Sequence, residues 1–278
     1  MEHKRWQKLM IDVGSGPPLV LIPGMQGRWE WARPTVDALA RTFRVLSFSL
    51  AGDPGSGSRI DPRLGFDSFV VQIDRALENA GVGAATICGI SYGGLIAYRY
   101  ATLRPERTRH LVLASALPPD YEPDHRFRFY ERAPRLLFPV FIVGSARRVS
   151  PEIRQALPRW TDRARGAVAQ GFRVLGAPAS PTRMCERMRL LEHVDFTTRT
   201  RVTAPTLVLT GERGLDRTVP VDLTERYLNL IPGAERAWLP RTGHMGTVTR
   251  PGEFARLVHE FVARQEDPMN NLHARMAG

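Results

Sequence analysis

Short apolar runs alternate with amphipathic stretches over most of this 278-residue chain. The apolar runs predict strands at residues 7–13, 18–22, 44–50, 85–88, 109–115, 206–209 and 234–239. Apolar residues at helical spacing predict helices at residues 30–42, 66–79, 95–103 and 251–264. Such alternation predicts an α/β fold with a mostly parallel, doubly wound sheet, and the half-polar first strand is expected at its edge.

The alternation breaks between residues 120 and 197, where proline and arginine are frequent and several short helices are expected. We therefore predict one core formed by residues 1–119 and 198–278, with a helical unit at 120–197 inserted into it. A chain of this length can bury one sizeable core and still carry such an insertion.

A serine stands in a glycine-rich turn, Gly89-Ile90-Ser91-Tyr92-Gly93-Gly94, between a predicted strand and a predicted helix. Helix and strand pack closely around such a turn, so its neighbours must lack bulky side chains. The turn would expose the Ser91 hydroxyl above the sheet and direct the first free N–H groups of the helix to the same place. The pattern predicts a nucleophilic serine.

Two further groups follow predicted strands later in the chain. Asp216 lies in the loop after residues 206–209, and His244 lies in the loop after residues 234–239. The parallel strands would bring both loops to the edge where Ser91 stands. With the order Ser, Asp, His, the chain resembles the α/β-hydrolase superfamily from about residue 10 to about residue 264.

The resemblance implies a catalytic triad. His244 would accept the proton of Ser91, and Asp216 would hold the imidazole in its tautomer. Glu212 on the same loop and Asp120 after an earlier strand are alternatives for the acid. Asp216 is preferred because Asp-x-x-Val-Pro resembles the acid loop of the family.

The resemblance also implies an oxyanion hole formed by the backbone N–H groups of Met25 and Tyr92. Relatives usually carry histidine before the glycine of the first loop, whereas this chain has Pro23. The backbone donor survives that change, but a histidine anchor for the loop does not, so we expect the loop to be held differently.

By the same resemblance, residues 120–197 would form a cap over the site. Gly24, Trp29, Phe138 and Phe141 are candidates for the pocket lining. The apolar run at 136–143 is too short to span a bilayer. We interpret it as a cap helix packed over the pocket, and the alternative is a lipid-facing patch flanked by arginines.

The net charge of +11 could suggest a nucleic-acid partner, but the distribution of charge argues against one. Of the 39 basic residues only Lys4 and Lys8 are lysine, and the arginines are scattered without aromatic interleaving. We expect a small-molecule substrate, no nucleic-acid partner, no transmembrane segment, no metal and no cofactor. Neither a disulfide framework nor a signal peptide is expected, which favours a cytoplasmic location.

These features predict a serine hydrolase that cleaves an ester, thioester or lactone of a small to medium hydrophobic substrate through an acyl-enzyme. Two alternatives keep the same triad: a carbon–carbon bond hydrolase and a cofactor-free perhydrolase. A third alternative is a ligand receptor with vestigial hydrolase activity.

Overall fold

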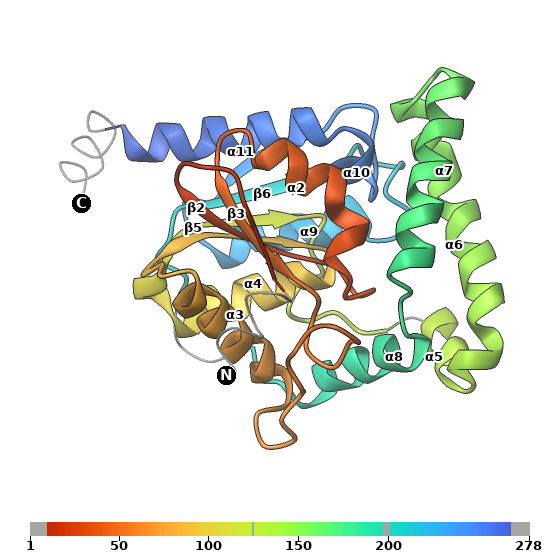
Figure 1. Ribbon diagram of the computed structural model, residues 1–278, viewed down its shortest axis with the longest axis horizontal. Coiled ribbons are helices and arrows are strands. Elements are labelled where there is room, and N and C mark those ends of the chain that lie inside the picture. Colours follow the sequence, from red (N-terminus) through yellow and green to blue (C-terminus); the bar gives the residue numbers. More distant parts are fainter. Residues whose placement is uncertain (1–9, 124, 197–200, 268–278) are drawn as a thin grey trace.

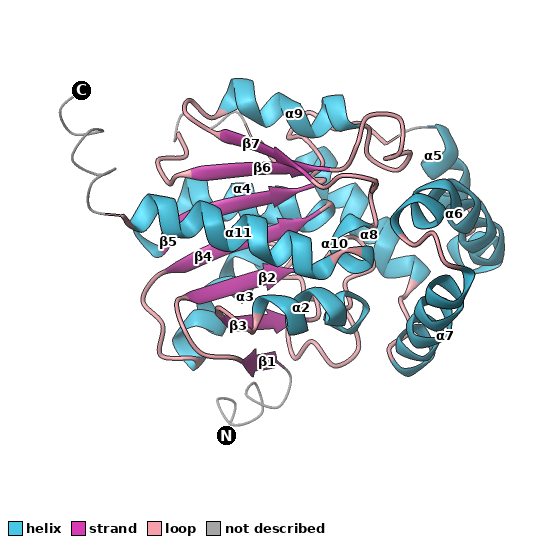
Figure 2. Ribbon diagram, turned by 90° about the horizontal axis from the view of Figure 1, so that it is seen from above, coloured by secondary structure: helices cyan, strands magenta, loops and turns pink. Residues whose placement is uncertain are grey.

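A seven-stranded, mostly parallel sheet forms the centre of the molecule, as Figure 2 shows. This computed structural model describes residues 10–123, 125–196 and 201–267. The strands are β1 (Met10–Val13), β2 (Pro18–Ile22), β3 (Arg44–Phe48), β4 (Ala85–Ile90), β5 (Thr108–Ala114), β6 (Thr206–Thr210) and β7 (Glu235–Trp238). Their order across the sheet is β1-β3-β2-β4-β5-β6-β7.

The pairing of the strands confirms the predicted doubly wound sheet. β1 pairs antiparallel with β3, and every other pair is parallel. β1 lies at an edge, as its half-polar sequence predicts. Residues 7–9 of the predicted first strand lie outside the described residues.

Helices cover both faces of this sheet (Figure 1). They are α2 (Arg33–Leu39), α3 (Ser68–Asn79), α4 (Tyr92–Leu103), α9 (Val221–Leu230), α10 (Gly246–Thr249) and α11 (Pro251–Glu266). Single 3-10 turns occupy Trp29–Ala32, Gly65–Asp67, Pro105–Arg107 and Leu191–His193.

Alternate side chains of the central strands enter two different cores. Val20 and Ile22 of β2 pack with α3, α4 and α9, whereas Leu19 and Leu21 pack on the opposite face with α2 and α11. All four side chains are fully buried. A strand covered on both faces requires the continuous apolar run seen in the sequence.

The predicted helices exist, but their bounds differ: α3 begins at Ser68 instead of residue 66, α11 ends at Glu266 instead of residue 264, and the other two differ more. The helix expected at 30–42 is a 3-10 turn followed by α2, which carries proline in its first turn and ends at Leu39. The helix expected from residue 95 begins three residues earlier, at Tyr92, immediately after the serine. The turn at Ser91 is therefore tighter than predicted.

Four helices follow β5 and precede β6 along the chain. They lie beside the carboxyl ends of the strands (Figure 2). They are α5 (His125–Glu131), α6 (Pro134–Ala156), α7 (Trp160–Gly176) and α8 (Pro181–Leu190). The expectation of short helices is wrong for α6, which has 23 residues, and for α7, which has 17. α6 continues through Pro139 and Pro151. The predicted boundary at residues 197 and 198 lies outside the described residues.

Among the described helices, none is long and apolar enough to cross a membrane.

Candidate active site

Ser91 occupies a strained turn between β4 and α4. Its φ of 55° and ψ of −119° lie in a region that residues other than glycine rarely adopt. A Cβ on Gly89 would lie 2.1 Å from the Gly93 carbonyl oxygen, and one on Gly94 would lie 2.3 Å from the Ala116 Cβ. The glycines thus allow the close approach that leaves Ser91 at the carboxyl end of β4.

Backbone hydrogen bonds hold this strained residue in place. The Ser91 N–H donates to the Ala114 carbonyl at 2.9 Å, at the end of the neighbouring strand β5. The Ser91 carbonyl accepts from the N–H groups of Gly94 at 2.9 Å and Leu117 at 3.3 Å. A conformation that costs about 1–3 kcal/mol persists because the surrounding backbone over-determines it.

Asp216 and His244 are brought together by the loops after β6 and β7. The Asp216 Oδ2 lies 3.1 Å from the His244 Nδ1. The other carboxylate oxygen accepts from the N–H groups of Thr218 at 3.0 Å and Val219 at 2.8 Å. With Nδ1–H donating to Asp216, Nε2 of His244 is left as the acceptor that a general base needs.

The pKa of His244 is raised above its ordinary value, because the effects that raise it outweigh those that lower it. Burial lowers the pKa, but the charge and hydrogen bond of Asp216 and the charge of Glu152 raise it, and Arg148 opposes them. Among the described residues, the Ser91 hydroxyl makes no hydrogen bond with His244. Catalytic hydrogen bonds often form only when substrate is bound.

The two alternative acids have other partners. Glu212 accepts from the backbone N–H of Arg241 at 2.7 Å, and Asp120 pairs with Arg226 at 2.5 Å on the surface. Of the three acids considered from the sequence, Asp216 is the one that hydrogen-bonds with His244.

The loop after β2 lies beside the serine. A Cβ on Gly24 would be 3.5 Å from the Ser91 Cβ, and the Gly27 N–H closes a turn onto the Gly24 carbonyl at 2.8 Å. The N–H of Tyr92 is the first of α4, so it has no partner within its helix. Met25 in this turn and Tyr92 in α4 therefore flank Ser91.

Arg187 of α8 anchors that loop, a role the sequence did not reveal. Its Nη1 donates to the Met25 carbonyl at 2.8 Å, and its Nη2 pairs with Asp53. Both side chains are fully buried, and a Cβ on Gly27 would collide with both. This ion pair holds the loop that lacks a histidine before its glycine. Nothing in the sequence distinguishes Arg187 from the other 36 arginines as a buried residue.

Glu152 of α6 holds the histidine loop, and the sequence did not reveal this either. Its Oε2 accepts from the N–H groups of Gly243 and Met245, on either side of His244, at 2.8 Å each. The residue is 1% exposed, and burial raises the pKa of its carboxyl to about 7, against the effect of these hydrogen bonds and of His244. α6 thus contributes a titratable group next to the histidine.

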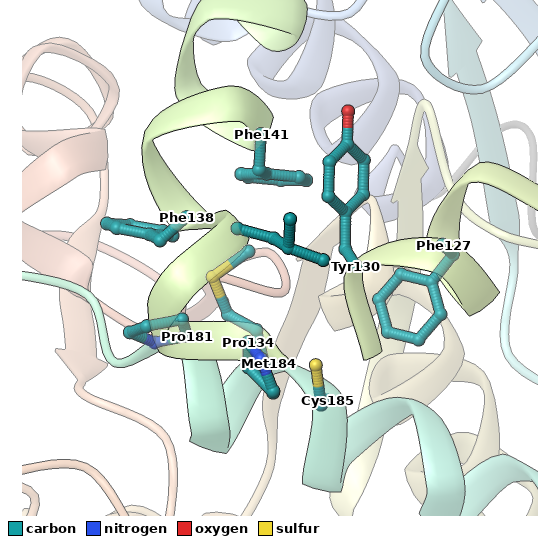
Figure 3. A pocket seen from close by; sticks show the side chains of 9 residues that line it. Phe127, Tyr130, Pro134, Phe138, Phe141, Pro181, Met184 and Cys185 are labelled. Atoms are coloured by element: carbon teal, nitrogen blue, oxygen red, sulfur yellow. The ribbon is translucent and has the colours of Figure 1, made fainter. Parts of the chain in front are cut away.

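An apolar cleft lies among α5, α6 and α8 (Figure 3). It is small and opens to solvent, and Phe138, Phe141, Tyr130 and Met184 contribute to its lining. Two of the four predicted pocket residues, Phe138 and Phe141, therefore lie together here, with ring planes 11° apart.

The other two predicted pocket residues lie elsewhere. Gly24 is in the loop beside Ser91, and Trp29 packs against the core on the α2 side with the Arg33 guanidinium 5.8 Å from its ring centroid. Within residues 10–123, 125–196 and 201–267, no cluster of three His, Cys, Asp or Glu side chains could hold a metal ion.

Comparison with known proteins places this geometry in a family. Residues 19–257 match the alpha/beta hydrolase family. A 2-hydroxy-6-oxo-2,4-heptadienoate hydrolase of Pseudomonas putida is 25% identical over 92% of this chain and 92% of its own. A pimeloyl-[acyl-carrier protein] methyl ester esterase of Nitrosomonas europaea is 26% identical over 87% of this chain and 94% of its own.

A solved structure has the same fold. The esterase of Exiguobacterium antarcticum superposes with a TM-score of 0.74 at 19% identity, covering 91% of this chain and 94% of that one. Because the family match covers residues 19–257, most of the chain, this protein belongs to the alpha/beta hydrolase family.

Proposed function

We propose that this protein is a serine hydrolase that cleaves an ester, thioester or lactone through an acyl-enzyme at Ser91. The observation that carries the proposal is the strained Ser91 turn at the same sheet edge as the Asp216–His244 hydrogen bond. A serine hydroxyl needs a base before it can attack, and His244 presents Nε2 for that purpose.

In the proposed reaction the Ser91 Oγ attacks the substrate carbonyl carbon while His244 takes its proton. The N–H groups of Met25 and Tyr92 stabilise the resulting oxyanion. His244 then protonates the departing alcohol, thiol or ring oxygen, and a water that it activates releases the acid from Ser91. Asp216 keeps Nδ1 protonated and stabilises the imidazolium.

We infer that α5–α8, within residues 120–197, form a cap that supplies the substrate pocket. The lining of the cleft at Phe138 and Phe141 is apolar, which supports a small to medium hydrophobic substrate, although it includes no residue of the proposed triad. A cytoplasmic location stays a prediction.

Intact mass after exposure to a fluorophosphonate tests the nucleophile. We expect one adduct on the wild type and none on Ser91→Ala. Ser115→Ala is a matched control, because Ser115 also follows a central strand with positive φ, at 42°, and its loss should leave the adduct in place. An adduct that survives in Ser91→Ala, or vanishes in Ser115→Ala, would show that the nucleophile is misassigned.

Hydrolysis of a carbon–carbon bond with the same triad is the second candidate. It is favoured by the similarity to the 2-hydroxy-6-oxo-2,4-heptadienoate hydrolase over 92% of both chains. Product analysis separates the two reactions, because an ester yields an acid and an alcohol, whereas a vinylogous diketone yields an acid and a second fragment whose leaving carbon has gained a C–H bond. Ligand-dependent stabilisation without an adduct or turnover would favour a receptor instead.

A further inference from the structure

Exposed apolar side chains gather on one part of the molecule. Among the described residues twelve large hydrophobic side chains are exposed, and nine of them lie on α5, α6 and α7. Single exposed hydrophobic residues are normal on a protein surface, but a contiguous group marks an interaction site.

The spacing on α6 and α7 shows that the exposed residues are not scattered. Leu136, Val140 and Val143 follow one another at i, i+4 and i+7 on α6, and their exposed fractions are 78%, 52% and 51%. This interval places them on one face of the helix.

α7 repeats the arrangement. Val168, Phe172 and Leu175 have the same spacing and are 60%, 71% and 80% exposed. Both helices lie at the outer flank of the molecule, as Figure 1 and Figure 2 show, so the apolar stripes that a globular helix normally buries face solvent here.

Unpaired positive charge accompanies the two stripes. Residues 134–176 contain eight arginines and two acids, Glu152 and Asp162. Within the part of the chain that the structure describes, five of the eight arginines are exposed and form no ion pair: Arg135, Arg147, Arg154, Arg159 and Arg165. In contrast, many arginines on the strands and on the helices that cover the sheet pair with nearby carboxylates, as Arg33 of α2 does with Asp37.

We propose that the exposed face of α6 and α7 docks on a membrane surface that contains anionic lipids. The apolar stripes would enter the boundary between headgroups and acyl chains, while the unpaired arginines bind the headgroups. The excess of positive charge disfavours a second copy of this chain as the occupant, because the two faces would repel each other. The proposal does not depend on the catalytic assignment.

Vesicle flotation tests the proposal with the full-length chain. We expect the protein to float with vesicles of phosphatidylcholine and phosphatidylglycerol at low salt and to remain unbound with phosphatidylcholine alone. Phe172→Ser combined with Leu175→Ser should weaken binding at least tenfold. Leu230→Ser combined with Trp238→Ser, two exposed residues outside α5–α7, is the matched control and should bind as the wild type does.

The charge contribution has its own variant. Arg147→Gln should weaken binding to anionic vesicles roughly fivefold, and binding should fall as salt is raised. Equal binding to both kinds of vesicle, or equal binding by the Phe172/Leu175 and Leu230/Trp238 variants, would overturn the proposal. A dimer in sedimentation that the Phe172/Leu175 variant dissociates would also overturn it and assign the face to a second copy.

Discussion

The burial of the Glu152 carboxyl allows a quantitative prediction of how the free energy of unfolding depends on pH. Burial raises the pKa of this carboxyl from 4.5 to about 7. A raised pKa means that the protonated form stabilises the fold, so this contribution is complete below pH 4.5 and is lost as the pH rises to about 7. At about 1.4 kcal/mol for each tenfold change in proton affinity, the loss is about 3 kcal/mol.

Glu152→Gln removes the charge and keeps a carbonyl oxygen that can accept from Gly243 and Met245. Urea unfolding at pH 5 and pH 8 measures the effect. We expect the wild type to lose about 2–3 kcal/mol relative to the variant between these two pH values. His244 titrates in both proteins, so the comparison removes most of its contribution.

Glu192→Gln is the control, because Glu192 is an exposed carboxylate that belongs to the same segment. Its stability should follow the wild type at both pH values. Parallel curves for Glu152→Gln and the wild type would refute the reasoning, since they would mean that Glu152 ionises as freely in the folded protein as in the unfolded chain.

The same substitution also tests the electrostatic effect of Glu152 on His244. The charge of Glu152 raises the pKa of His244, whereas Arg148 lowers it. We expect the acid limb of kcat/KM for Glu152→Gln to move to lower pH by up to about one pH unit. A purely structural role would change the rate without moving that limb.

Five further substitutions, two of them controls, address the site and its supports. Asp216→Asn should lower kcat by about 10³–10⁴-fold in an ester assay, and Glu212→Gln should leave it within about tenfold of the wild type. Arg187→Ala leaves a buried carboxylate unpaired and should cost about 3–5 kcal/mol in urea unfolding, whereas Arg189→Ala on the same helix, 55% exposed, should cost less than about 1 kcal/mol. Gly93→Ala would place a Cβ 2.5 Å from two backbone carbonyl oxygens and should abolish fluorophosphonate labelling.

The sheet could be predicted from the sequence because the central strands are covered on both faces and are mostly apolar. β2 shows this directly, since Leu19 to Ile22 are all buried. The serine turn was also predictable, because Gly89, Gly93 and Gly94 meet backbone or side-chain atoms at distances that exclude a Cβ.

The supports of the site could not be predicted, because they depend on contacts across long stretches of chain. Glu152 meets Gly243 from 91 positions away, and Arg187 meets Asp53 from 134 positions away. Neither residue belongs to a local pattern, and each looks like a solvated charge in the sequence. The extent of α6 was missed because Pro139 and Pro151 suggested that the helix ends.

The anchoring of α8 through Arg187 limits which of the helices α5–α8 can separate from the rest of the molecule. Separating Arg187 from Asp53 would leave two buried charges without a partner, at a free-energy cost of about 3–5 kcal/mol. At that cost, roughly one molecule in a few hundred or fewer would have this contact broken at equilibrium. α6 is tethered near its carboxyl end by Glu152. The amino-terminal half of α6, which carries Phe138 and Phe141, takes part in neither anchor, so in the proposed cap we expect it to move more readily than the anchored part of α8.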